Sequence, residues 1–233
     1  MNDFLSITGS SPEELTRILH LASAAKLRPG RYGSALAGRS VGLFFMKPST
    51  RTRVSSEVAA LQLGAHPIVL KDSEVGLGGR ETVEDVARVL DRYLDVLALR
   101  VFGHGDLVKI ADEANAPVIN LLSDREHPCQ AVADLQTLAE VRPLEGAKLA
   151  FVGDGNNVCH SLMVAGAMVG VEMRIATPPG FEPDESFVDV ARRYGSVTVT
   201  NDVHEAVRSA DAVYTDVWTS MGQEEEKARR LAA

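Results

Sequence analysis

Short apolar runs alternate with amphipathic stretches along most of the chain. Apolar residues recur at helical spacing from Leu15 to Ala22 and predict a helix over residues 12–26. The run SVGLFFM predicts a buried strand at residues 40–46, and Thr82 with Asp85 fits a capping box at a helix start. The same alternation predicts further strands at 66–70, 95–101 and 116–122, and helices at 50–63, 83–94, 106–115 and 128–141.

The alternation is interrupted once, at RPLEGAK (142–148), where Pro143 and Gly146 are typical of a linker. It then resumes, with strands expected at 148–153, 171–178, 197–200 and 211–217, and helices at 157–169, 183–194 and 202–209. Strands that alternate with helices are typical of parallel, doubly wound sheets. We therefore expect two α/β domains, residues 1–142 and 146–233, each built on a doubly wound parallel sheet.

Composition narrows the class of protein. The 233 residues are 45% hydrophobic and carry a formal net charge of −8, which argues against a nucleic-acid or anionic-membrane binder. No apolar run is long enough to span a membrane, and the N-terminus lacks the pattern of a signal peptide. The only cysteines, Cys129 and Cys159, fall in predicted helices, so we expect a reduced, cytoplasmic protein without a disulfide framework.

Unusual polar residues follow five of the predicted strands. Open α/β sheets bind ligands at the carboxyl ends of their strands. The residues at those ends are Ser49 to Arg53, Arg100, SDREHPCQ after residue 122, DGNN after residue 153, and TDVWTSM from residue 215. Their shared position predicts that they form the functional site.

Arg51 and Arg53 stand at the start of a predicted helix, where the backbone dipole disfavours cations. Unpaired backbone N–H groups, the hydroxyls of Ser49 and Thr50, and two guanidinium groups together suit a dianion such as phosphate. A P-loop is excluded because its glycine and lysine pattern is absent. The alternative is a solvated helix start that happens to carry arginines.

His127 and Gln130 occupy the first turn of a helix whose first position suits Pro128. A histidine there can polarise a carbonyl oxygen or transfer a proton, although it could also serve only as a cap. With Arg100 arriving from the neighbouring strand, the set suggests an acyl phosphate, with phosphate at one end and a polarised carbonyl at the other.

The second predicted domain opens with FVGDGNN, which invites a dinucleotide-binding interpretation. That pattern fails, because Val158 stands at the third glycine and no acid ends the next strand. Asn157 can instead bind a carboxylate or an ammonium, and Asp216 can pair with an ammonium or cap a helix.

These motifs together resemble the aspartate and ornithine carbamoyltransferase family, in order and along the whole chain. The shared motifs are Ser-Thr-Arg-Thr-Arg, the arginine ending LALR, His-Pro-x-Gln, Asp-Gly-Asn-Asn and Asp-x-Trp-x-Ser-Met-Gly. The first and third occur throughout the family, whereas DGNN and DVWTSMG match its ornithine-specific members.

The resemblance implies a role for each matched residue. Ser49, Thr50, Arg51 and Thr52 would bind the phosphate of carbamoyl phosphate. Arg100 and His127 would polarise the carbamoyl oxygen, with Arg51 contributing to catalysis, and Gln130 would contact the carbamoyl amide. Asn157, Asp216, Ser220 and Met221 would hold L-ornithine.

The reaction implied is carbamoyl transfer to the δ-amine of L-ornithine, giving L-citrulline and phosphate in arginine biosynthesis or a urea-cycle-type step. It needs neither a metal nor an organic cofactor. Trimers of two-domain subunits are expected, with no nucleic-acid or membrane partner. Two alternatives stay open: another amine as acceptor, or a non-catalytic carbamoyl-phosphate-binding fragment.

Three departures from the family pattern are visible. Met46 stands where the family usually has glutamate, and Gly76 stands where it commonly has a polar residue that reaches carbamoyl phosphate. The sequence also stops at Ala233, before a His-Cys-Leu-Pro motif and a late arginine. The second domain is therefore expected to be incomplete unless further residues or a partner chain complete it.

Overall fold

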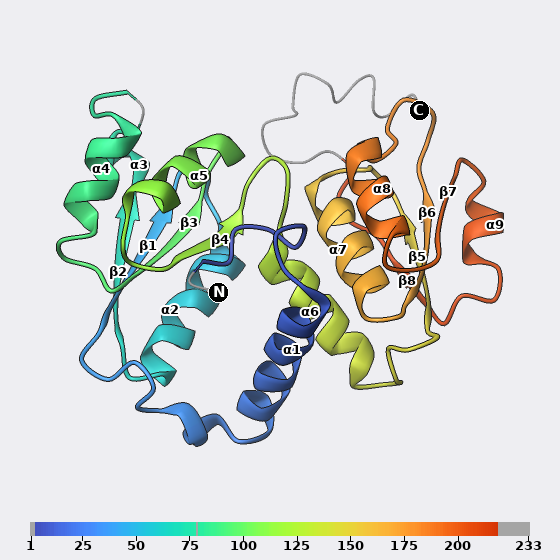
Figure 1. The fold of residues 1–233 in the computed structure, drawn as a ribbon, viewed down its shortest axis with the longest axis horizontal. Coiled ribbons are helices and arrows are strands. Elements are labelled where there is room, and N and C mark those ends of the chain that lie inside the picture. Colours follow the sequence, from blue (N-terminus) through green and yellow to red (C-terminus); the bar gives the residue numbers. More distant parts are fainter. Residues whose placement is uncertain (1–2, 78, 219–233) are drawn as a thin grey trace. The chain divides into compact units, whose positions relative to one another are not determined.

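The structure is a computed structural model that describes residues 3–77 and 79–218 (Figure 1). The chain forms two compact units. The first comprises the residues up to Gly9 together with Arg17–Cys129, and the second comprises Ser10–Thr16 and the chain from Gln130 onward. Helix α1 (Pro12–Leu27) therefore contributes its first turn to one unit and its remainder to the other.

The first unit contains a parallel sheet that has four strands within its described residues, in the order β2-β1-β3-β4. Strands β2 and β3 lie on opposite sides of β1, so the order in which strands are added to the sheet reverses between β1 and β3. Such a position is called a switch point, and open α/β sheets bind ligands there. The elements of this unit after α1 are η1 (Pro29–Tyr32), β1 (Ser40–Phe45), α2 (Thr50–Gln62), β2 (His66–Lys71), α3 (Asp72–Val75), α4 (Val83–Leu90), β3 (Val96–Arg100), α5 (His104–Glu113) and β4 (Val118–Leu122).

Both faces of this sheet are covered, as Figure 1 shows for α2 on one side and for α4 with α5 on the other. The alternation of side chains along β1 sends Phe44 into one core, with residues of α4 and α5, and Leu43 and Phe45 into the other, with Ala60 of α2. Coverage on both faces explains why β1 reads as a continuous apolar run.

The second unit also contains a parallel sheet that has four strands in the part of the chain described, in the order β7-β6-β5-β8. The switch point here falls between β5 and β8. Helix α7 packs on α8 and β6, and α9 packs on β5, β6 and β7 (Figure 1). The elements are α6 (Pro128–Ala139), β5 (Lys148–Val152), α7 (Asn157–Met168), β6 (Glu172–Ala176), α8 (Glu185–Arg192), β7 (Val197–Thr200), α9 (Val203–Val207) and β8 (Ala212–Tyr214).

The predicted fold class, two parallel-sheet α/β domains, is confirmed. Two predicted ends are wrong: strand β8 ends at Tyr214 rather than near residue 217, and helix α4 ends at Leu90 rather than near residue 94. Its end is set by Asp91, whose carboxylate accepts hydrogen bonds from the backbone N–H groups of Asn115 and Ala116, both at 2.8 Å. The short elements η1 and α3 were not predicted.

The boundary between residues 142 and 146 stays a proposal, supported by the loop that follows α6. Both cysteines are free, as predicted, and burial raises the pKa of Cys129 to about 12. Of the helices in the described residues, none combines the length and the apolar character needed to cross a membrane.

Candidate active site

The first turn of α2 has the arrangement that the sequence predicted. Ser49 is the N-cap, and its hydroxyl accepts a hydrogen bond from the backbone N–H of Thr52 at 3.3 Å. Arg51 is exposed and makes no hydrogen bond or ion pair with another described residue, whereas Arg53 pairs with Glu57 at 3.6 Å. Arg51 is thus a cation on a positive helix end without a counter-charge in the described chain.

Arg100 is the last residue of β3, and the ladder with β4 shifts register between Leu99 and Arg100. Such irregularities redirect a side chain locally. Its guanidinium Nη1 lies 3.5 Å from the Ser49 hydroxyl and 3.4 Å from the Thr52 hydroxyl. The β3 end and the α2 start therefore supply one joint site.

Arg100 is only 8% exposed, and its Nε is buried with no hydrogen-bond partner among the described residues. Burial lowers the pKa of this guanidinium, since the charged form has lost water. No carboxylate in the described chain forms an ion pair with it. A buried cation whose neighbours are hydroxyls is the environment that an anion would complete.

His127 directly precedes α6 and is 8% exposed. Burial, and secondarily the positive charge of Arg100, lowers its pKa to about 4. The imidazole is therefore neutral at physiological pH. It adds an uncharged N–H donor beside a charged one, so the site can bind an anion and polarise a carbonyl oxygen.

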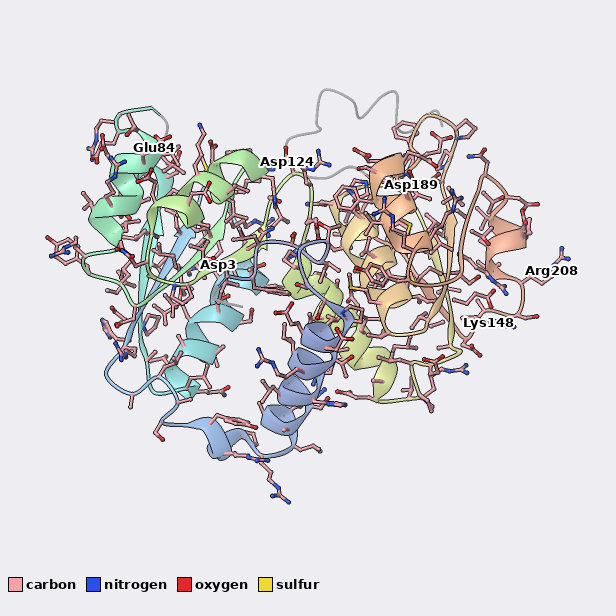
Figure 2. The ribbon with its side chains drawn as sticks, viewed as in Figure 1. Asp3, Glu84, Asp124, Lys148, Asp189 and Arg208 are labelled. Atoms are coloured by element: carbon pink, nitrogen blue, oxygen red, sulfur yellow. The ribbon has the colours of Figure 1, made fainter. Side chains whose placement is uncertain are left out.

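The loop that carries His127 is fixed by Glu126, a buried carboxylate that sequence reasoning missed. Glu126 accepts hydrogen bonds from the N–H of Ile7 at 2.7 Å and from the hydroxyl of Thr8 at 2.7 Å. Just upstream, Asp3 (labelled in Figure 2) accepts from the N–H of Val118 at 2.8 Å, so the N-terminal segment runs alongside β4.

The Asp-Gly-Asn-Asn motif follows β5 in the second unit, at the switch point of that sheet. Asn156 caps α7 by accepting from the N–H groups of Val158 and Cys159 at 3.0 and 3.1 Å. Asn157 is the first residue of the helix and is half-buried. Gly155 is required by close packing, because a Cβ there would lie 2.2 Å from the backbone nitrogen of Pro183.

Asp216 follows β8 on the other side of that switch point, and its Oδ1 accepts from the N–H of Val217 at 2.7 Å. The structure thus places Asn157 and Asp216 after the paired strands β5 and β8. Ser220 and Met221, the other predicted ornithine contacts, lie outside the described residues.

Asp134 and Tyr214 are further polar residues that sequence reasoning missed. Asp134 accepts a hydrogen bond from the Gln130 side chain at 2.8 Å, and Gln130 and Asp134 are one helical turn apart on α6. This i,i+4 spacing after HPCQ was the signal that could have found Asp134. The nearness of Tyr214, on β8, could not be read from the sequence.

Met46 and Gly76, the two residues that depart from the family pattern within the described chain, each have a structural role. Met46 packs against the core formed with α4 and α5. Gly76 ends α3 with φ of 68°, in the left-handed region, where a Cβ would lie 3.0 Å from that of Arg80. Glycine is the residue that this turn accepts most easily.

Within the described chain, no group of three or more His, Cys, Asp or Glu residues could hold a metal ion.

Comparison with protein families gives two matches that together span most of the chain. Residues 2–140 match "Aspartate/ornithine carbamoyltransferase, carbamoyl-P binding domain", and residues 145–233 match "Aspartate/ornithine carbamoyltransferase, Asp/Orn binding domain".

Curated relatives and solved structures agree with these matches. An ornithine carbamoyltransferase of Listeria monocytogenes is 49% identical over 99% of this chain and 75% of its own length. One from Methanoculleus marisnigri is 47% identical over 99% of this chain and 76% of its own. The structure of ornithine carbamoyltransferase from Pyrococcus furiosus superposes with a TM-score of 0.93 at 44% identity, covering 99% of this chain and 76% of that one.

Proposed function

Because the chain belongs to the aspartate/ornithine carbamoyltransferase family, we propose that it transfers the carbamoyl group of carbamoyl phosphate to the δ-amine of L-ornithine. The products are L-citrulline and phosphate. The observation that carries the proposal is Arg100, a buried guanidinium that has only hydroxyls within reach and no carboxylate partner in the described chain.

We assign the phosphate of carbamoyl phosphate to the α2 start. The backbone N–H groups of its first turn, the hydroxyls of Ser49, Thr50 and Thr52, and the Arg51 guanidinium are all donors. Dianion binding there supplies the negative charge that the helix end and its arginines lack.

The carbamoyl end is assigned to Arg100, His127 and Gln130. The neutral δ-amine attacks the carbamoyl carbon, and the carbonyl oxygen gains negative charge as the new C–N bond forms. Arg100 and the neutral His127 donate to that oxygen; each preorganised donor can contribute roughly 3 kcal/mol. The C–O bond to phosphate then breaks, and the attacking nitrogen gives its proton to the leaving phosphate, which departs as hydrogen phosphate.

The amino-acid end of L-ornithine is assigned to the edge of the second sheet. Asp216 is suited to the α-ammonium and Asn157 to the α-carboxylate, with Ser220 and Met221 as further contacts. An acidic group at this edge selects an acceptor that carries a positive charge away from the reacting amine.

Citrulline formation tests the proposal directly. The full-length protein is supplied with carbamoyl phosphate and L-ornithine, and with N-acetyl-L-ornithine, L-lysine, putrescine or L-aspartate as competing acceptors. We expect turnover with L-ornithine to exceed that with every other amine. Turnover with a different acceptor would reassign the substrate, and binding without turnover with any amine would make the protein a binding module.

The wider context is proposed on the same basis. We propose a cytoplasmic enzyme of arginine biosynthesis that assembles as trimers, as the family resemblance implies. Light scattering coupled to size-exclusion chromatography measures the assembly: a mass of one or two subunits would contradict it.

A further inference from the structure

A polar cluster in the second unit joins α6 to the end of β8. Gln130 donates from Nε2 to Oδ1 of Asp134 at 2.8 Å. Oδ2 of Asp134 is buried and has no hydrogen-bond partner among the described residues. The hydroxyl of Tyr214 is close enough to lower the pKa of Asp134. The ring of Tyr214 stacks on Phe151, with centroids 5.6 Å apart.

The hydrogen bond to Asp134 determines which end of the Gln130 amide is available. An ionised carboxylate only accepts hydrogen bonds, so the –NH2 end of the amide must face it. Oε1 of Gln130 then points away from Asp134, and it accepts no hydrogen bond from another described residue. A glutamine held in this way presents an acceptor to a ligand, whereas a freely rotating amide would present either end.

We propose that Asp134 is a positioning residue: it fixes the Gln130 amide so that Oε1 accepts an N–H from the –NH2 group of the carbamoyl donor. The inference rests on the proposed function, because that function names the donor whose –NH2 is read. Asp134 acts through Gln130 and is therefore a specificity determinant that distinguishes –NH2 from groups of the same size that donate nothing.

Electrostatics give this arrangement a pH limit. Burial, and further the negative charge of Asp216, raises the pKa of Asp134 to about 6, against the opposing effect of Gln130 and Tyr214. Burial and the charges of Asp134 and Asp216 raise the pKa of Tyr214, so its hydroxyl stays protonated. Above pH 6 the carboxylate holds the amide. Below it, the neutral acid can donate to Oε1, and the amide can turn over.

Two stable phosphonates test the inference because they differ only at the group in question. Phosphonoacetamide carries –NH2 and phosphonoacetone carries –CH3 at the same position. We expect the wild-type protein to bind phosphonoacetamide about tenfold more tightly at pH 8, the value of one hydrogen bond. In Asp134→Ala the ratio should fall toward one while the Kd of phosphonoacetone stays unchanged. Calorimetry with the full-length protein measures both.

Asp134→Asn is the matched variant, since it keeps the shape and the packing of the side chain. It removes the negative charge at position 134, and it no longer fixes the Gln130 amide in one orientation. We expect an intermediate ratio that no longer changes between pH 8 and pH 5, whereas the wild-type ratio falls over that range. Ionisation of the phosphonate and of His127 affects both ligands alike and cancels in the ratio.

The outcomes separate this inference from the proposed function. If either variant weakens both phosphonates equally, Asp134 is merely structural and the inference is wrong. A wild-type ratio of one, together with normal citrulline formation, also overturns the inference and leaves the function intact. If the wild-type protein binds neither phosphonate and forms no citrulline, the proposed function fails, and the inference fails with it.

Discussion

Both sheets are parallel and each has a switch point, yet their strand orders differ and the groups at the two switch points have opposite charge. Between β1 and β3 the buried charged group is Arg100, whose near neighbours are hydroxyls and a neutral His127. Between β5 and β8 the groups are acidic: Asp216 raises the pKa of Asp134, and Asp154 contributes to the raised pKa of Cys159. The first edge carries a buried positive charge without a carboxylate partner in the described chain, and the second carries several negative charges.

On the proposed assignment of the site residues, this difference specialises one architecture for two substrates. In both units a strand ends, a helix begins, and backbone N–H groups face the same edge of the sheet. Side chains added to that frame decide which ion is bound. We propose that the edge of the first sheet binds the dianion of carbamoyl phosphate and that the edge of the second binds the ammonium of L-ornithine.

The strongest test of the cationic edge removes its buried charge. Arg100→Met should reduce carbamoyl transfer on the order of 10³-fold, since it removes a preorganised donor from the developing oxyanion. The ligand-free protein should keep or gain thermal stability, because an unpaired buried cation is replaced by an apolar chain. Steady-state kinetics and calorimetric unfolding measure the two effects. A marked loss of stability would mean that Arg100 has a structural partner.

A smaller effect distinguishes the two arginines of α2. Arg51→Ala should weaken phosphonoacetamide binding roughly 10- to 100-fold, the value of charge-assisted hydrogen bonds, without destabilising the ligand-free helix. Arg53→Ala is the control, because Arg53 lies on the same helix but pairs with Glu57. Its affinity should remain within about threefold of the wild type, since an exposed ion pair contributes little. Equal losses in both variants would argue for a general electrostatic effect.

The acidic edge should respond in the opposite sense, and more weakly. Asp216→Asn should raise the KM for L-ornithine about tenfold, as expected for loss of one charge pair, and leave phosphonoacetamide binding nearly unchanged. It should also lower the pKa of Asp134 from about 6, because the like charge that raises it is removed. Carboxyl-carbon NMR titration measures that pKa. An unchanged pKa would show that the charge of Asp216 does not contribute to it.

The sequence predicted much of the fold because the information was local. Apolar runs, the Thr82 cap and Pro128 at a helix start each specify structure within a few residues, and each is found as predicted. The end of α4 was missed because Asp91 bonds to residues 24 and 25 positions away. Contacts at that separation leave no periodic signal.

In the candidate site, too, local features could be predicted from the sequence, whereas those that depend on distant residues could not. Ser49 at a helix N-cap could be predicted, since strand and helix meet there in the sequence. The isolation of Arg100 from carboxylates depends on how three strands bring their ends together. The pKa of Asp134 is raised mainly by burial and further by Asp216, and is lowered by Tyr214; both of these residues are some 80 positions distant along the chain. A sequence motif can identify such residues, but it does not explain their charge states.

The bonding of Glu126 has a practical consequence for anyone expressing this protein. The hydrogen-bond donors of Ile7 and Thr8 occupy a carboxylate that is only 1% exposed and lies next to His127. A misassigned start codon, or an affinity tag that replaces the first eight residues, would leave that carboxylate buried without those donors. Recombinant designs should therefore keep Ile7 and Thr8 with the residues before them unchanged.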